Sequence, residues 1–246
     1  LLTHAAGERD GFFMMMLADN FRAVFWIAAI PAVAAVGILV AVVKEPSTAS
    51  VKVRQNPISR SDLKLLGPSY RLVVIFGFVF SLARYSEAFL LLRAESVGVT
   101  PGTIPAMLML MNVVYFLTVY PVGRWSDRVG RKGWLRAGLA VLILSNLTLA
   151  MADTGIAVAV GVALWGLHMG LTQGLLAAMV ADQAPSQLRG TAFGFFNLAC
   201  GLALLAASVT AGWLWVRYGA SVTFLTGAGI AAAAFGIYMI FSRRMA

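Results

Sequence analysis

The amino-acid sequence predicts an all-α, polytopic membrane protein with seven transmembrane helices. Apolar residues make up 60% of the 246 residues and charged residues only 12%, about half the usual charged share of a soluble domain. The apolar residues gather in runs close to the roughly 20 residues that span a bilayer. These runs lack the two-residue alternation of a membrane β-barrel, so helices are expected.

The predicted spans follow one another along the chain, with short polar segments between most of them. A shorter apolar stretch, 11–18, precedes them and is interpreted as the end of another helix. The segment 44–71 is long, polar and contains proline, which favours an extramembrane linker. The spans are expected at 23–43, 72–92, 101–122, 134–152, 156–181, 191–216 and 221–241.

The segments between the predicted spans differ sharply in charge. Alternation places 44–71, 123–136, 182–190 and the C-terminal tail on one side of the membrane. That side holds 14 of the 19 Lys and Arg residues, and the other side holds four. Because cytoplasmic loops collect Lys and Arg, we expect the C-terminus inside and the N-terminus outside. The net charge of +9 then reflects membrane topology, and no nucleic-acid partner is expected.

The predicted loop 123–136 carries an ordered motif as well as positive charge. It reads Gly123-Arg-Trp-Ser-Asp127-Arg128-Val-Gly130-Arg131-Lys132. Two glycines permit a tight turn near the membrane, and a carboxylate among cations can pair with one of them or cap a helix. Any cytoplasmic loop can be basic, but this order of residues resembles the G-x-x-x-D-R-x-G-R-R/K signature of the major facilitator superfamily at every position.

A second run is similar to the entry into helix 11 in many members of that family. It extends from Asp182 through Pro185 and Arg189-Gly190 to Gly194. The resemblance implies that the seven spans are helices 6 to 12 and that 11–18 is a remnant of helix 5. Residues 1–43 would then end an N-terminal half, 44–71 would link the halves, and 72–246 would form the C-terminal six-helix domain.

The resemblance implies secondary transport of a small solute by alternating access. The expected form is proton-coupled efflux by an antiporter of the bacterial inner membrane, with the lipid bilayer and a missing N-terminal half as partners. The alternative is a truncated fragment that does not transport without that half. In the family, the residue equivalent to Asp127 latches helices on the cytoplasmic side in the outward-facing state. Arg128, Arg131 and Lys132 would share this network, and Gly123 and Gly130 would permit close packing.

Ionisable and polar groups inside the spans are functional candidates because burying them in a membrane is costly. Arg84 and Glu87 stand three residues apart, so they are expected to share a helix face and to pair. The pair either faces a central cavity, where it binds solute or protons, or only stabilises packing. Asn112 and Tyr115 have the same spacing and contact either a substrate or another helix.

The predicted span 156–181 has a polar stripe opposite a glycine seam. The stripe contains Trp165, His168 and Thr172, and His168 can carry a proton near neutral pH. It either faces a cavity or is hydrogen-bonded inside the bundle. Two seams of small residues are expected to support close helix packing. They are Gly166, Gly170 and Gly174 in one span, and Gly190, Gly194, Asn197 and Gly201 in another.

The sequence gives little support to an enzyme. A single cysteine, Cys200, and two histidines, His4 and His168, provide no cluster with the spacing of metal ligands. There is no phosphate-binding Walker loop for ATP-driven transport. We therefore expect no metal, no cofactor and no catalytic activity.

Overall fold

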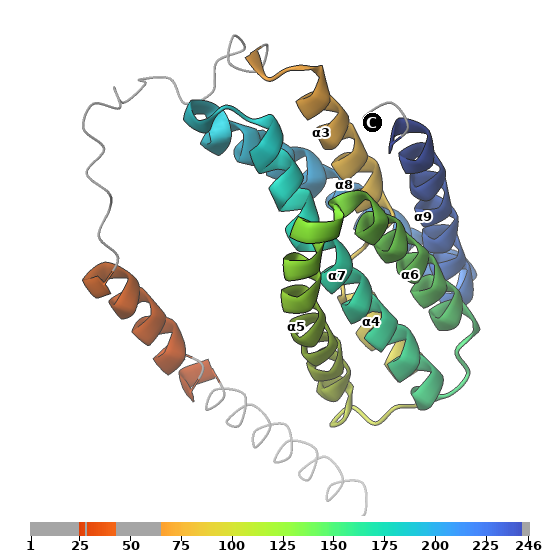
Figure 1. Ribbon diagram of the computed structural model, residues 1–246. Coiled ribbons are helices and arrows are strands. Elements are labelled where there is room, and N and C mark those ends of the chain that lie inside the picture. The colour runs from red at the N-terminus through yellow and green to blue at the C-terminus, as the bar shows by residue number, and fades with distance from the viewer. Residues whose placement is uncertain (1–24, 28, 43–64, 243–246) are drawn as a thin grey trace, which may run out of the picture. The chain divides into compact units, whose positions relative to one another are not determined.

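The computed structural model describes residues 25–27, 29–42 and 65–242, and the regular structure in these ranges is helical (Figure 1). Helix Phe25–Val42 is apolar and long enough to cross a membrane. It belongs to a separate unit, 1–55, and is described by itself. The expected helix remnant 11–18 and most of the expected linker 44–71 lie outside the described residues.

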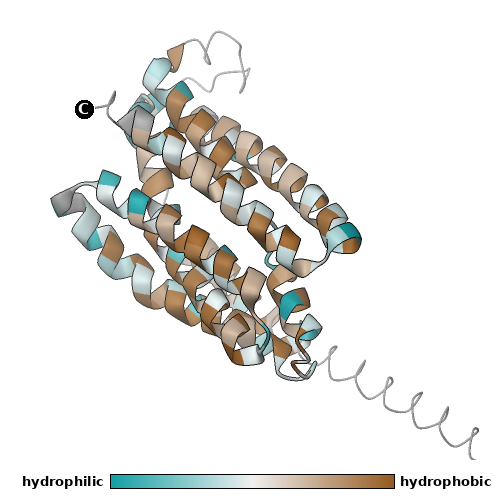
Figure 2. Cartoon of the chain, turned by 90° about the vertical axis from the view of Figure 1, so that its right-hand side faces the viewer, coloured by the Kyte–Doolittle hydropathy of each residue, from teal (hydrophilic) through white to brown (hydrophobic). Residues whose placement is uncertain are grey.

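The larger unit, 56–246, contains the other five helices long and apolar enough to cross a membrane among those described. Figure 2 shows hydrophobic residues along most of their lengths and hydrophilic residues mainly near their ends. The prediction of an all-α polytopic membrane protein is therefore confirmed. These helices are α5 (Ile104–Val129), α6 (Arg131–Met151), α7 (Gly155–Gln183), α8 (Arg189–Tyr218) and α9 (Ala220–Ser242).

The predicted span 72–92 is not one continuous helix. It is divided into α3 (Pro68–Leu82) and α4 (Ala88–Ser96), and residues 83–87 between them are non-helical. Two contacts hold this interruption in place. The Tyr85 hydroxyl donates to Asn146 Oδ1 of α6 at 2.7 Å, and the Ser86 N–H donates to Ser208 Oγ of α8 at 3.1 Å.

The predicted loop 123–136 is also different from expectation, because almost all of it is helical. Helix α5 continues to Val129 and α6 starts at Arg131, which leaves Gly130 alone between them. Gly130 has φ +93° and ψ 152°, a backbone conformation that is essentially restricted to glycine. Basic residues are good helix formers, so the charges that suggested a loop extend both helices beyond the apolar spans.

Helix α7 is the centre of the bundle and packs between α5 and α6 (Figure 1). Its first turn is capped by Thr154, whose hydroxyl oxygen accepts from the Ala157 N–H at 3.2 Å. After α7, Pro185 and a short 3-10 helix, Ser186–Leu188, lead into α8. Helix α9 lies against α6, and α3 lies against α8.

The loops meet at two opposite ends of the bundle. At one end Arg131 of α6 pairs with Asp182 of α7. At the other end Arg93 of α4 donates through Nε to the Leu149 carbonyl oxygen at 2.9 Å, and Ser221 Oγ donates to the Ala150 carbonyl oxygen at 2.8 Å. This arrangement agrees with the predicted alternation of the spans, and which end is cytoplasmic stays a prediction.

Candidate functional site

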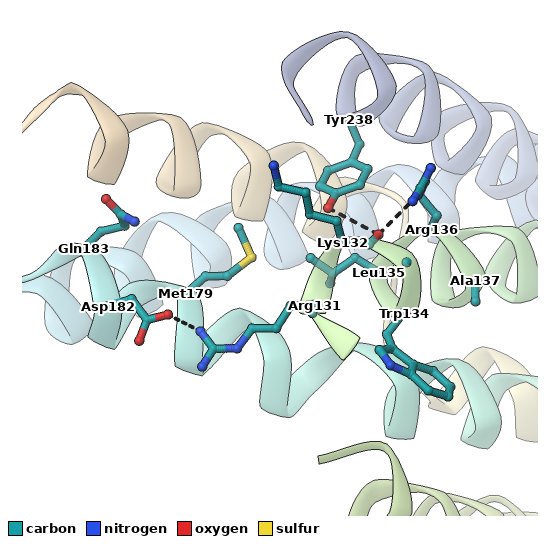
Figure 3. Close-up of a pocket in the computed structure, with 12 residues that line it drawn as sticks. Arg131, Lys132, Trp134, Leu135, Arg136, Ala137, Met179, Asp182, Gln183 and Tyr238 are labelled. Atoms are coloured by element: carbon teal, nitrogen blue, oxygen red, sulfur yellow. Dashed lines mark hydrogen bonds and ion pairs between the residues drawn. The ribbon is translucent and has the colours of Figure 1, made fainter. Parts of the chain in front are cut away.

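The motif residues at the turn between α5 and α6 form one end of the candidate site. Because Gly130 turns the chain in a single residue, Arg131 starts α6 next to the C-terminal end of α7. There its guanidinium Nη1 donates to the Asp182 carboxylate (Figure 3). The Arg131 side chain is 28% exposed and that of Asp182 is 54% exposed, so this ion pair is accessible to solvent and to rearrangement.

A cavity of about 810 Å³ opens beside this ion pair. Three of its lining side chains are basic, and Asp182 is the acidic one. The Tyr238 hydroxyl and Arg136 Nε both donate to the Lys132 carbonyl oxygen, at 3.4 and 3.3 Å (Figure 3). The cavity is lined by residues 130–137 of the turn and α6, Met179, Asp182 and Gln183 of α7, and Tyr238 of α9.

The other predicted gating residues lie on the same two helices. Gly123 is inside α5 and makes no turn, because that helix continues past it. Arg128 is exposed on the last turn of α5, and the side chain of Asp127 lies outside what the structure describes. Trp125 and Trp134 stack across the turn with ring centroids 6.1 Å apart. The gating role of these residues stays a prediction.

Arg84 and Glu87 do not lie on one helix face, so the geometry expected from their spacing is wrong. Both are in the non-helical segment between α3 and α4 and are partly buried. No ion pair joins them among the described residues, although Arg84 lies within electrostatic range of the Glu87 carboxylate. Arg84 Nε is buried without a hydrogen-bond partner.

The polar stripe of α7 faces the inside of the bundle. Trp165, His168 and Thr172 have no exposed surface. His168 Nδ1 lies 2.8 Å from the Gly138 carbonyl oxygen of α6, and Thr172 Oγ1 donates to the His168 carbonyl oxygen at 2.8 Å. Trp165 Nε1 and His168 Nε2 are buried without partners. The expectation of a histidine hydrogen-bonded inside the bundle therefore holds for Nδ1 of His168, whereas Nε2 is left without a partner.

Asn112 and Tyr115 do not form a shared polar pair. Asn112 is exposed on α5, and its Nδ2 donates to the Leu108 carbonyl oxygen of the same helix at 2.8 Å. Tyr115 is partly buried and packs against the core cluster that contains Trp165. Arg84 is within electrostatic range of Tyr115.

The two predicted packing seams behave differently. A Cβ added at Gly166 would lie 2.3 Å from the Met111 carbonyl oxygen, and one at Gly170 would lie 2.7 Å from Thr118 Cβ, so both glycines let α5 approach closely. A Cβ added at Gly174 would meet no other side chain or neighbouring helix within 4 Å. The seam of α8 lies on a face that points away from the described bundle. It is therefore exposed, and no described helix packs on it. Its members are Gly190, Gly194, Asn197 and Gly201.

Sequence reasoning missed three structural partners. Asp182 was noted only within a motif, whereas it pairs with Arg131. Asn146 is fully buried and accepts from Tyr85. Arg93 is one of the four basic residues that the sequence places on the less basic side of the membrane, and the structure shows that it donates to carbonyl oxygens at the C-terminal end of α6, where a cation is favourable. A polar residue within an apolar span was the available signal for Asn146.

Comparison with known proteins decides the family. The sequence profile described as "Major Facilitator Superfamily" matches residues 72–245. The chain belongs to the major facilitator superfamily. The chain is also similar to an uncharacterized MFS-type transporter of Methanocaldococcus jannaschii. The two sequences are 30% identical over 225 residues, which cover 89% of this chain and 55% of that protein.

Two further relatives match shorter parts of the chain. The inner membrane transport protein YajR of Escherichia coli is 28% identical over 61% of this chain and 34% of its own length. The uncharacterized MFS-type transporter YwfA of Bacillus subtilis is 30% identical over 50% of this chain and 30% of its own length. The chain therefore spans about half the length, or less, of these curated relatives, and it is an integral membrane protein of a transporter family.

Proposed function

We propose that this chain forms the C-terminal half of a secondary active transporter that moves a small solute by alternating access. The observation that carries the proposal is the interruption of one span at residues 83–87, where a cation lies among buried polar groups. In secondary transporters, solute sites form at such broken helices near the middle of the membrane. A charge inside the membrane is energetically costly, and a span with only a structural role does not need one.

The Arg131–Asp182 ion pair is proposed to belong to the cytoplasmic gate. It joins the first residue of α6 to the C-terminal end of α7, so a movement of either helix changes it. Its partial exposure keeps its strength modest, which suits a contact that must form and break in each cycle. Asp127, Arg128 and Lys132 would complete this network at the α5–α6 turn.

The proposed coupling ion is the proton, and the proposed direction is efflux across the bacterial inner membrane with the C-terminus in the cytoplasm. Glu87 supports proton coupling, because it is an ionisable group within the membrane region. The basic residues of the α5–α6 turn support the orientation.

The second half of the transporter is proposed to pack partly on the exposed seam of α8. Its glycines permit close approach of another helix, and Asn197 places an amide on that face. The length of the Methanocaldococcus relative, of which this chain covers 55%, supports a second half of comparable size. A chain without that half would be the non-transporting alternative.

The test is transport into everted membrane vesicles containing the chain, alone and joined to a second six-helix half. Ethidium, benzoate and glucose serve as cationic, anionic and neutral probes. We expect proton-driven accumulation of at least one probe only with the second half present, and its loss when an uncoupler is added. Accumulation no higher than in empty vesicles for all three probes would contradict the proposal.

The gate is tested in the same vesicles. Arg131→Gln, Asp182→Asn and Asp127→Asn are each expected to reduce transport while membrane insertion stays normal. Asp153→Asn is the matched control, because Asp153 is an exposed carboxylate at the opposite end of α6 and α7. Normal rates in the first three variants would refute the gating assignment.

A further inference from the structure

Three buried side-chain nitrogen atoms of the described residues have no hydrogen-bond partner. They are Nε of Arg84, Nε1 of Trp165 and Nε2 of His168. Leaving a buried polar group unpaired costs about 1–3 kcal/mol, and more for a charged group. Because buried polar groups in folded proteins are almost always paired, these three exceptions call for a physical explanation.

The three nitrogen atoms belong to one region of the bundle. Phe80, at the end of α3, and Tyr85, next to Arg84, both pack on α7: the rings of Phe80 and His168 have centroids 5.4 Å apart, and those of Tyr85 and Trp165 are 5.5 Å apart. The Trp165 and His168 rings are 6.4 Å apart. Arg84 is close enough to His168 for its charge to act on the imidazole. The segment carrying Arg84 therefore lies directly against the α7 stripe.

The position of Arg84 is fixed by its neighbours. Tyr85 is 5% exposed and is tied to Asn146 of α6, and the Ser86 backbone is tied to Ser208 of α8. These contacts hold the non-helical segment from both sides. A backbone held in this way loses little conformational entropy when a ligand arrives, so the interruption keeps the backbone of Arg84 in place beside the α7 stripe.

The charge of Arg84 is not neutralised by an ion pair among the described residues. Glu87 is the carboxylate within electrostatic range, but it does not reach salt-bridge distance. Guanidinium groups bind carboxylates through parallel N–H donors in a planar arrangement. Trp165 Nε1 is a donor only, so it adds a second donor to the same region. An anionic group accepts hydrogen bonds from donors of both kinds.

We propose that Arg84, supported by Trp165 Nε1, forms the binding site for the carboxylate of an organic anion. This inference rests on the proposed transport function and names its substrate class. The aromatic rings of Phe80 and Tyr85, which are buried in this conformation, contact the rest of the molecule once it has entered. His168 Nδ1 faces a carbonyl oxygen and carries the proton of the neutral ring, so Nε2 offers a lone pair to a hydroxyl or N–H group of the same ligand. Trp165 and His168 are covered in this conformation, and ligand entry displaces the side chains over them.

The test is a binding titration of the purified chain in lipid nanodiscs, followed by fluorine NMR of the ligand. Para-fluorobenzoate and para-fluorobenzamide have nearly the same shape and differ in charge. We expect the carboxylate to bind at least about tenfold more tightly than the amide, since a hydrogen bond to a charged group contributes more than a neutral one. Equal affinities for the two ligands would overturn the proposal.

Four variants assign the binding to its residues. Arg84→Gln is expected to abolish the preference for the carboxylate, and Arg84→Lys to retain part of it. Trp165→Phe keeps an aromatic ring but removes the N–H together with the five-membered ring, so we expect about fivefold weaker binding of the carboxylate. Arg217→Gln, at an exposed arginine in the last turn of α8, is the control and is expected to bind like the unmodified chain.

Each outcome of the variant series decides the proposal. An Arg84→Gln chain that keeps the preference refutes it. If circular dichroism shows that this variant does not fold, Arg84→Lys and Trp165→Phe decide, and unchanged affinity in both refutes the proposal. The proposed transport function is judged separately. If the protein still transports ethidium but shows no preference for the carboxylate, the anion site is refuted and the transport function is not.

Discussion

The hydrogen bond between Tyr85 and Asn146 is expected to stabilise the interrupted span, and Tyr85→Phe tests it. The substitution removes the hydroxyl and leaves the ring in place. Tyr85 is 5% exposed and Asn146 is fully buried. Asn146 Nδ2 remains paired with the Leu142 carbonyl oxygen at 2.9 Å, but Oδ1 loses the donor that lay 2.7 Å away.

Two estimates bracket the magnitude of this loss. A buried acceptor left without a donor costs about 1–3 kcal/mol in water-soluble proteins. Interhelical hydrogen bonds in membrane proteins contribute less, about 0.6 kcal/mol on average and at most about 1.7, because the unfolded chain in the membrane also finds partners. Almost complete burial of this pair places it at the upper end, so we expect Tyr85→Phe to lower the free energy of unfolding by about 1–2 kcal/mol.

The assay is unfolding in mixed micelles with a denaturing detergent, followed by circular dichroism. Tyr120→Phe is the matched control, because Tyr120 is 74% exposed on α5, and little change is expected. In an Asn146→Ala background the acceptor is absent, and Tyr85→Phe should then cost close to nothing. An equal cost in both backgrounds, or no cost in the unmodified chain, would show that this bond does not hold the interruption.

The remaining predictions concern glycines and use the same unfolding assay. Gly166→Ala is expected to cost about 1–3 kcal/mol, because the new Cβ would lie 2.3 Å from a backbone carbonyl oxygen, whereas Gly174→Ala has open space and should be neutral. Gly130→Ala is expected to lower the free energy of unfolding by about 1–3 kcal/mol, because the backbone conformation of Gly130 disfavours other residues. Gly123→Ala is its control, since Gly123 lies inside α5 and an added Cβ there would meet no atom of another element within 4 Å. Equal stability within either pair would contradict the packing or the turn assignment.

The apolar runs of the sequence were sufficient to predict the class of fold and most of the spans. They could not show the interruption at residues 83–87, because average hydropathy over 20 residues hides a short polar segment. The local run Arg-Tyr-Ser-Glu was the available signal. The interruption itself depends on tertiary partners, Asn146 and Ser208, which lie far away in the sequence.

The motif residues were predictable from their order, but their geometry was not. Positive charge suggested a loop at 123–136, although basic side chains also extend a helix beyond the membrane. The pairing of Arg131 with Asp182 joins residues 51 positions apart, and nothing local in the sequence specifies it. In the same way, helical spacing suggested an Arg84–Glu87 pair that depended on a helix the tertiary structure interrupts.

The measurement that tests alternating access most directly is the labelling of a cysteine placed at Asn197 on the exposed face of α8. Cys200 is first replaced by alanine so that the introduced thiol is the only one. With the second half present, its rocking against the α8 seam opens this packed face toward each side in turn, so a membrane-impermeant maleimide is expected to label this thiol from both sides of the membrane. Leu198→Cys, on the adjacent apolar face, should react from neither side. Labelling of Asn197→Cys from one side only under all conditions, or from neither side, would contradict alternating access through this face.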